Sequence, residues 1–253
     1  MASLLEKLLG TITGRGADMV AVAKAGPVLA EMSAWAAAGG TTARPTAALA
    51  AVQARMATVA AELAGQRRQT SFRHELVDMD AGELVKKISS SRRAQTIVHQ
   101  LAVTFKPSRV LELGSAFGSA TMAMASGLAA VASVRLDGIE LDPWRAGIAD
   151  TNVKSVLGDR GAVHAGSIGE VLPGLVREGG KAGLVFVDAV HRLEETWAYH
   201  LCMLDSVHSG AVVVYDDVDW SQDMTRCWRE IVATPDVVEA VLLHNRWGVA
   251  VYR

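Results

Sequence analysis

The sequence predicts an α/β protein with a doubly wound, mostly parallel seven-stranded sheet that ends in an antiparallel strand, preceded by a helical extension. Two observations predict this class. From residue 109 onward, short apolar runs alternate with segments long enough to form helices, an order typical of parallel sheets with right-handed crossovers. The chain then closes with two β-branched apolar runs only three residues apart, which predicts a hairpin rather than another crossover unit.

The first 88 residues are predicted to be a helical segment. Alanine-rich stretches such as Thr46–Ala64 favour helix, and no run in this part is typical of a strand. Three residues interrupt the apolar stretch Ala17–Ala38: Lys24, Pro27 and Glu31. This stretch therefore indicates a packed helical hairpin and not a membrane span. We expect the helical segment to cap a binding site, to mediate formation of a homodimer, or both.

A basic cluster follows these helices and consists of Arg67, Arg68, Arg73 and His74. Two interpretations stay open. The cluster is a solvated helix end, or it contacts a phosphate or an acidic substrate.

The alternating part of the chain contains five predicted parallel strands: Val110–Leu113, Val134–Ile139, Ala162–Ala165, Leu184–Val187 and Val212–Tyr215. The closing hairpin is predicted at Val237–Leu243 and Trp247–Tyr252, on either side of His244, Asn245 and Arg246. In a doubly wound sheet, ligands bind at the carboxyl ends of the parallel strands. Functional residues are therefore expected where these runs end.

Composition limits the classes of function. The 253 residues, half of them hydrophobic, can form one sizeable core and an additional segment. The net charge of −2 provides no general attraction for nucleic acid. Cys202 and Cys227 lack metal-ligand spacing, so we expect buried thiols in a reducing compartment. Since the sequence shows no convincing export signal, we expect a cytoplasmic protein that binds a small molecule and neither nucleic acid nor membrane.

Residues 110–118 join a buried strand to a glycine turn that a ligand can approach closely. Gly114 and Gly118 remove side chains where the chain bends and packs against the next helix. A steric requirement alone can explain such a turn. Two acids argue for a ligand, because Glu112 places a charge inside an apolar strand and Glu140 ends the next strand. This pair suits a ligand with an ammonium group and ribose hydroxyls.

These features together resemble the class I S-adenosylmethionine-dependent methyltransferases, whose fold is Rossmann-like. The segments Phe186–Arg192 and Tyr215–Ser221, with Met224 and Trp228 following, are similar to a bacterial branch of that superfamily. This branch is related to the metal-dependent catechol-type O-methyltransferases. The resemblance implies a methyltransferase domain at residues 89–253 and leaves the N-terminal helical segment outside.

The resemblance also implies a place for each part of S-adenosylmethionine. The methionyl end would lie at the glycine turn, near Glu112, Gly114, Ser115, Gly118 and Asp188. The ribose would bond to Glu140, whose two carboxylate oxygens accept hydrogen bonds, with Leu141 beside it. The adenine would contact Gly166, Ser167 and Ile168. Ser167 also has the pattern of a helix N-cap, since Glu170 follows three residues later as in a capping box.

Three further acids, Asp188, Asp216 and Asp217, end two predicted strands and are expected to converge above the sheet edge. Because like charges repel, something cationic should lie among them. In the catechol-type relatives, matching residues hold a divalent ion such as magnesium, which would bind a substrate hydroxyl and lower its pKa. Asp217 stands where many relatives carry Asn. Alternatively, these carboxylates cap helices or bond to the cofactor and substrate.

His191 follows Asp188 by three residues and falls where the catechol-type enzymes carry a lysine that takes the hydroxyl proton. We expect His191 and Asp188 to be catalytic, since histidine can act as a base near neutral pH. The alternative is a histidine that simply opens the next helix. Trp220 and Trp228 either line an acceptor pocket or, at helical spacing, belong to the core.

The predicted function is methyl transfer from S-adenosylmethionine to a hydroxyl of a small-molecule or sugar-like acceptor, with magnesium or another divalent cation as a candidate aid. Two alternatives stay open. One is a non-catalytic S-adenosylmethionine-binding or assembly module of the same fold. The other is an NAD(P)-dependent oxidoreductase, which is disfavoured because the G-x-G-x-x-G fingerprint is absent.

Overall fold

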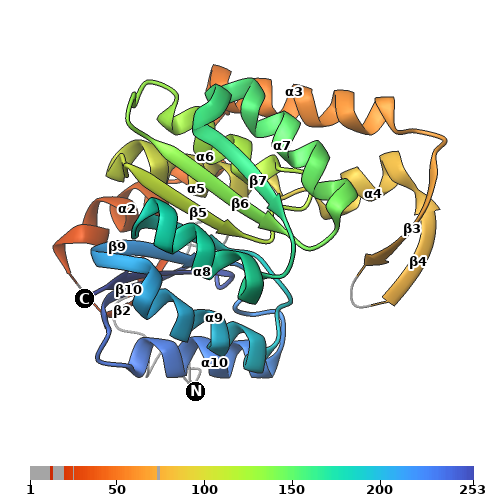
Figure 1. Ribbon diagram of the computed structural model, residues 1–253. Coiled ribbons are helices and arrows are strands. Elements are labelled where there is room, and N and C mark those ends of the chain that lie inside the picture. The colour runs from red at the N-terminus through yellow and green to blue at the C-terminus, as the bar shows by residue number, and fades with distance from the viewer. Residues whose placement is uncertain (1–11, 14–19, 25, 73–74) are drawn as a thin grey trace.

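The computed structural model describes residues 12–13, 20–24, 26–72 and 75–253. Its central feature is a nine-stranded sheet in the order β1-β2-β10-β11-β9-β8-β5-β6-β7 (Figure 1). The strands of this sheet are β1 (Ile12–Thr13), β2 (Val20–Lys24), β5 (Arg109–Leu113), β6 (Arg135–Glu140), β7 (Gly161–Ala165), β8 (Ala182–Val187), β9 (Val207–Tyr215), β10 (Val237–Leu243) and β11 (Trp247–Tyr252). A separate hairpin consists of β3 (Arg67–Phe72) and β4 (Glu75–Asp80).

The seven strands from β5 to β11 confirm the predicted fold class. Strand β5 pairs in parallel with β6 and β8, while β6 pairs with β7 and β8 with β9. Strand β11 is antiparallel to both β9 and β10. Each predicted apolar run overlaps one of these strands. The carboxyl ends of β5, β6, β8 and β9 therefore meet at one edge, together with the turn between β10 and β11.

Helices cover both faces of the sheet (Figure 1). One face carries α2 (Pro27–Ala37), α5 (Arg92–Phe105), α6 (Ser119–Leu128) and α7 (Pro143–Leu157), which share a core with Val110. The other carries α8 (Ile168–Gly179), α9 (Leu193–Ser206) and α10 (Gln222–Ala233), which share a core with Leu111. Val110 and Leu111 are neighbours on β5, and successive residues of a strand point to opposite faces. Apolar side chains that alternate along β5 thus contribute to the cores on both faces of the sheet.

The described residues also form two further helices and two 3₁₀ turns: α3 (Ala47–Glu62), α4 (Ala81–Ile88), η2 (Gly40–Thr42) and η3 (Gly158–Arg160). Helices α3 and α4 form a third apolar cluster with Phe117 and Met122, the latter a residue of α6. The predicted domain boundary after residue 88 falls between α4 and α5.

The N-terminal segment is not wholly helical, so the prediction of a helical hairpin at Ala17–Ala38 is wrong. Strand β2 pairs antiparallel with β10 at the edge of the large sheet. Lys24 Nζ donates to the carbonyl oxygens of Thr234 (3.0 Å) and Val237 (2.7 Å). The Glu239 carboxylate of β10 accepts the Val28 and Leu29 N–H groups at the start of α2. These long-range contacts attach the N-terminal segment to the edge of the large sheet.

The β3–β4 hairpin corrects a second expectation, because the basic cluster lies on a strand and not at a helix end. Arg67 pairs with Asp78 across the hairpin at 3.2 Å. Arg68 lies over the ring of Trp144, 4.7 Å from its centroid. The Thr70 hydroxyl donates to Asp142 Oδ2 at 3.1 Å. Arg73 and His74 lie outside the described residues.

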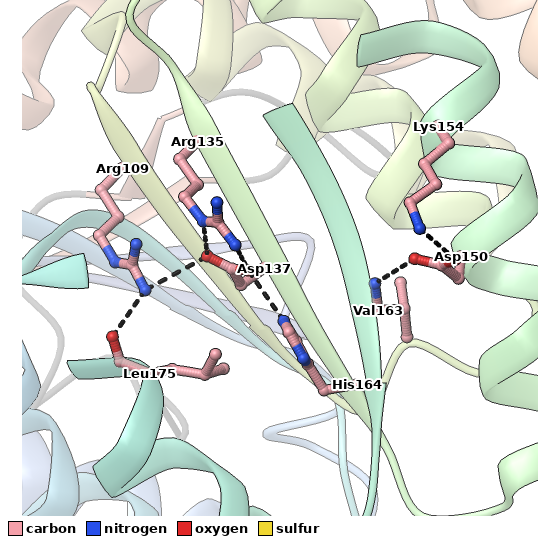
Figure 2. A network of polar contacts seen from close by, with 8 residues as sticks. All are labelled: Arg109, Arg135, Asp137, Asp150, Lys154, Val163, His164 and Leu175. Atoms are coloured by element: carbon pink, nitrogen blue, oxygen red, sulfur yellow. Dashed lines mark hydrogen bonds and ion pairs between the residues drawn. The ribbon is translucent and has the colours of Figure 1, made fainter. Parts of the chain in front are cut away.

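A buried ionic network on the face of β5, β6 and β7 centres on Asp137 (Figure 2). Asp137 is fully buried and pairs with Arg109 (3.2 Å), Arg135 (3.0 Å) and His164 (2.9 Å). Arg109 is also buried and donates to the Leu175 carbonyl of α8. One buried carboxylate thus holds three strands and a helix together, because its own charge is costly without these partners.

The cysteines are both unpaired, but they differ in environment. Cys227 on α10 is buried as expected, whereas Cys202 on α9 is exposed, so the prediction of two buried thiols is wrong for Cys202. In the part of the chain that the structure describes, no helix combines the length and the apolar character that a membrane crossing needs.

Candidate functional site

The glycine turn after β5 packs closely against the end of β8. Gly114 has φ of +94°, and a Cβ at this position would clash with the carbonyl oxygen of Asp188. Gly118, with φ of +84°, starts α6. The N–H groups of Gly114 and Ser115 both donate to the carbonyl oxygen of Ile139 on β6. Both predicted glycines are therefore required by the backbone, and the turn exposes main-chain groups at the carboxyl edge of the sheet.

Glu112 is a fully buried carboxylate beneath this turn. One oxygen, Oε2, accepts the hydroxyls of Ser115 (2.6 Å) and Thr121. The other, Oε1, is buried without a hydrogen-bond partner among the described residues. Burial, with the nearby charges of Asp188 and Glu140, raises the pKa of Glu112 to about 7 even though the two hydroxyls lower it. An acceptor oxygen is therefore available for a cationic group at the turn.

Glu112→Gln is expected to flatten the pH dependence of stability between about pH 4.5 and 7. The wild-type carboxyl has a higher pKa folded than unfolded, so the folded state binds more protons and stability falls as pH rises through this window. One proton corresponds to a slope of about 1.4 kcal/mol per pH unit. Urea unfolding at several pH values measures it, with Glu83→Gln, an exposed acid on α4, as control. An unchanged slope in Glu112→Gln would contradict this placement of the charge.

Glu140 at the end of β6 is also buried, and its two oxygens bind the neighbouring loops. Oε2 accepts the Ala116 N–H and Oε1 the Asp142 N–H, both at 2.9 Å. Arg145 Nε lies 3.2 Å from Oε1. Burial raises the pKa of Glu140, although Arg145 opposes that shift. Each carboxylate oxygen can accept a second hydrogen bond, so Glu140 keeps capacity for a ligand's hydroxyls.

The remaining predicted cofactor residues lie on the loops after β6 and β7. Leu141 is 69% exposed. Gly166 has φ of +145°, and its N–H donates to the Glu140 carbonyl oxygen. Ser167 is the N-cap of α8, and its hydroxyl donates to Glu170 at 2.6 Å. Ile168 packs partly buried against the core of that face. Ser167 thus occupies the N-cap position, but its hydroxyl makes no capping bond to the α8 backbone. The backbone bond of Gly166 places residues 166–168 beside Glu140.

A second cluster lies where β8 and β9 end. His191 Nε2 is 3.4 Å from Asp188 Oδ1 and 3.8 Å from Asp217 Oδ2. Burial lowers the pKa of His191, but the charges of Asp188, Asp217 and Asp216 outweigh it and raise the pKa overall. The structure therefore brings the predicted residues together, with a histidine nitrogen directed at two carboxylates.

Arg246, in the β10–β11 turn, is the cation that the sequence analysis missed. Its Nε lies 2.9 Å from Asp216 Oδ1 and 2.8 Å from Asp217 Oδ1. Burial, followed by the charge of Asp188, raises the pKa of Asp216 to about 7, and Arg246 opposes that shift. The sequence did indicate that a cation lies among the acids, and it placed Arg246 in the predicted turn of the closing hairpin. The sequence does not show the pairing register of β11 with β9, which places this turn beside Asp216.

The carboxylates do not fit the magnesium site that the resemblance implies. Two of the three, Asp216 and Asp217, direct oxygens at the Arg246 guanidinium. Asp188 faces His191. Among the described residues, no group of three or more histidine, cysteine or acidic side chains is arranged to hold a metal ion.

Backbone strain is concentrated at this edge. Among the described residues, all but one of the non-glycine positions with positive φ lie here: Ala116, Val190, His191, Asp217, His244 and Asn245, the exception being Lys106. A β-branched residue such as Val190, with φ of 63°, rarely adopts this conformation. Such strain persists where the surroundings enforce it and is typical of ligand sites.

The two tryptophans of the predicted acceptor pocket have different environments. Trp220 is 54% exposed, and its ring centroid lies 6.2 Å from that of His191. Trp228 is buried, as the core interpretation predicted, but it also lines a cavity of about 220 Å³. This cavity is lined by Val218, Asp219, Thr225, Trp228, Arg229, Leu242 and Asn245. Two of these lining residues, Val218 and Asn245, are the sequence neighbours of Asp217 and Arg246. The volume of the cavity is suited to part of a small molecule.

Comparison with known proteins identifies a matching family model for the part of the chain that holds both clusters. Residues 111–218 match the family model described as a methyltransferase domain. No curated protein matches the sequence significantly. The matched range includes every predicted site residue.

Solved structures with a similar fold include cofactor-bound Rv0187 from MTB, at 22% identity and a TM-score of 0.59, over 87% of this chain and 96% of that one. The O-methyltransferase TomG from Streptomyces achromogenes in complex with SAM matches at 20% identity and a TM-score of 0.61, over 83% and 91%. The O-methyltransferase from Bacillus cereus in complex with SAH matches at 20% and 0.57, over 83% and 92%. These matches confirm the predicted fold class.

Proposed function

We propose that this chain, which carries a methyltransferase domain of the class I fold, is an S-adenosylmethionine-dependent O-methyltransferase acting on a small hydroxyl compound. The observation that carries the proposal is the pair of buried carboxylates at the glycine turn. Glu112 keeps one oxygen without a partner among the described residues, and Glu140 lies across the turn from it, bonded to Ala116. A ligand with a cationic amine and a diol satisfies both.

We assign the parts of the cofactor to this edge in the order that the resemblance implies. The ammonium group would lie near Glu112, where a positive charge compensates a buried carboxylate. The ribose hydroxyls would donate to Glu140 and the adenine would contact the loop 166–168. Three of the similar structures are described as bound to a cofactor, to SAM or to SAH, which supports this choice of ligand.

When bound, S-adenosylmethionine supplies a methyl group already activated by its sulfonium, so the protein needs to align the acceptor and remove a proton. His191 is the base that we assign. With Nε2–H donating to Asp188, its Nδ1 is the nitrogen that would take the hydroxyl proton. The bound cofactor would supply the methyl group and leave as the neutral thioether, while His191 would hold the proton that the acceptor hydroxyl gives up.

The exposed Trp220 beside His191 and the cavity at Trp228 support a small acceptor with an apolar body. Dimer formation through the N-terminal segment and a cytoplasmic location stay predictions.

Glu140→Gln is expected to weaken binding of S-adenosylhomocysteine about 10- to 100-fold, because hydrogen bonds to a charged acceptor contribute roughly 1.5–3 kcal/mol. Isothermal calorimetry with S-adenosylhomocysteine measures this affinity. Glu83→Gln is the control that leaves it unchanged. Affinity equal to wild type in Glu140→Gln would refute our placement of the ribose.

Transfer of labelled methyl groups to a panel of small phenolic and sugar-like hydroxyl compounds distinguishes an enzyme from a binding module. Saturable binding of S-adenosylhomocysteine without transfer to any acceptor would favour the non-catalytic alternative. Binding of NADH in its place would favour the oxidoreductase.

A further inference from the structure

Arg246 is held in place from both its backbone and its side chain. Its N–H donates to the Leu243 carbonyl oxygen at 3.0 Å, and its own carbonyl oxygen accepts the Val218 N–H at 2.9 Å. The guanidinium carbon lies 5.1 Å from the centroid of the Trp247 ring. These contacts fix the β10–β11 turn against the loop that follows β9, so the guanidinium has a defined position and little freedom to leave it.

The guanidinium makes a planar contact with one carboxylate and a further contact with the next. Nε and a terminal nitrogen lie 2.9 and 3.3 Å from the two oxygens of Asp216. Nε also lies 2.8 Å from Asp217 Oδ1. Two-point pairing of this kind is the strong geometry for arginine and a carboxylate. Asp216 Oδ1 additionally accepts the Asp217 N–H at 2.8 Å.

Charge balance explains why a cation is needed here at all. Asp216 is 3% exposed and Asp217 is 9% exposed, so their mutual repulsion, and that of Asp188, acts in a poorly hydrated environment. Either a divalent ion or an arginine can compensate the negative charge of these carboxylates. Arg246 contacts both oxygens of Asp216 and Oδ1 of Asp217, so a metal ion bound to these oxygens and the bound guanidinium would exclude each other.

We infer that Arg246 takes the place of a divalent cation in this protein, so that the carboxylates at the ends of β8 and β9 bind no magnesium and methyl transfer needs no added metal. The part that concerns transfer rests on the proposed function. The part that concerns metal binding does not. In this role Arg246 is a positioning residue: it compensates Asp216 and Asp217, which leaves Asp188 to orient His191.

The first test is metal binding to the protein without cofactor. Titration with Mn²⁺, followed by its paramagnetic resonance signal, and with Mg²⁺, followed by calorimetry, is expected to show no saturable site in the wild type at millimolar metal. Arg246→Ala frees the carboxylate oxygens and is expected to gain a Mn²⁺ site. Arg246→Lys keeps a cation and is expected to gain none. Arg226→Gln, which removes an exposed arginine paired with Glu230 on α10, is the matched control.

Saturable Mg²⁺ or Mn²⁺ binding by the wild type, lost in Asp216→Asn, would overturn the inference. This outcome requires only the wild type and one mild variant to fold, and thermal unfolding by circular dichroism verifies that they do.

The second test uses any acceptor found in the methyl-transfer panel. Chelation with EDTA is expected to leave wild-type kcat within twofold, whereas Arg246→Ala lowers kcat at least tenfold and Arg246→Lys restores part of it. Loss of wild-type activity in EDTA with recovery in Mg²⁺ would overturn the inference while sustaining the proposed function. Failure of the chain to bind S-adenosylhomocysteine would refute the proposed function and leave the metal-binding result standing.

Discussion

His191→Gln is expected to lower kcat for methyl transfer by about 10²- to 10⁴-fold near neutral pH, the usual contribution of a positioned general base. The affinity for S-adenosylhomocysteine should stay within twofold, because the side chain lies with Asp188 and Asp217 and not at Glu140. Steady-state kinetics with labelled S-adenosylmethionine, and calorimetry on the same preparation, measure the two quantities.

The pH profile provides a second signature of this histidine. The surrounding carboxylates raise its pKa above the ordinary value of 6.5, so the neutral form that can accept a proton increases only at higher pH. Wild-type kcat should therefore rise with pH through that raised value, and the rise should vanish in His191→Gln. His208→Gln, at an exposed position of β9, is the control. A kcat that His191→Gln leaves unchanged is incompatible with our assignment of the base.

Asp137→Ala is expected to destabilise the protein by about 3–5 kcal/mol, the usual cost of removing one partner from a buried ion pair. Figure 2 shows Arg109 directed at Asp137. Because the Arg109 side chain is only 6% exposed, it would keep a buried charge and lose its carboxylate. Urea unfolding at neutral pH measures the loss.

The matched control for Asp137 is Arg135→Ala. Arg135 contacts the same carboxylate but its side chain is 52% exposed, so its removal should cost roughly 0–1 kcal/mol. Burial raises the pKa of Asp137, yet hydrogen bonds from His164 and Arg135 outweigh this and lower it. The stability that this group contributes is therefore present near neutrality and disappears as acid protonates the carboxylate. Equal losses in the two variants would show that burial does not decide the energy of this network.

The parallel core could be predicted because its signal is local. Strand β8 contains no polar side chain and three of the five residues of β5 are apolar, and each strand lies between helix-forming segments. Strand β2 gave no such signal. Its sequence, Val20–Lys24, contains two alanines and a lysine, and it becomes a strand by pairing with β10. Strand β3, with five polar residues among its six, depends likewise on its partner β4.

Residue types and strand ends predicted most of the candidate site, since the carboxyl ends of neighbouring strands must meet. Gly114, Glu112 and His191 lie where the sequence placed them. Arg246 and Arg145 could not be found in this way, because their roles depend on where a turn and a helix face end up in space. A charged residue in a turn is ordinarily expected to be exposed to solvent. Only the register between β11 and β9, Gly248 beside Tyr215, brings Arg246 to the acids.

The pairing of β2 with β10 has a consequence for the order in which the chain assembles. Lys24 and its acceptor Val237 are 213 residues apart, so β2 can join the large sheet through β10 only after the segment around Val237 has been synthesised. During that time β2 must neither aggregate nor pair elsewhere, and its alanines and lysine make it a weak aggregation sequence. The β2 edge of the sheet therefore forms late in folding, from two segments that lie far apart along the chain.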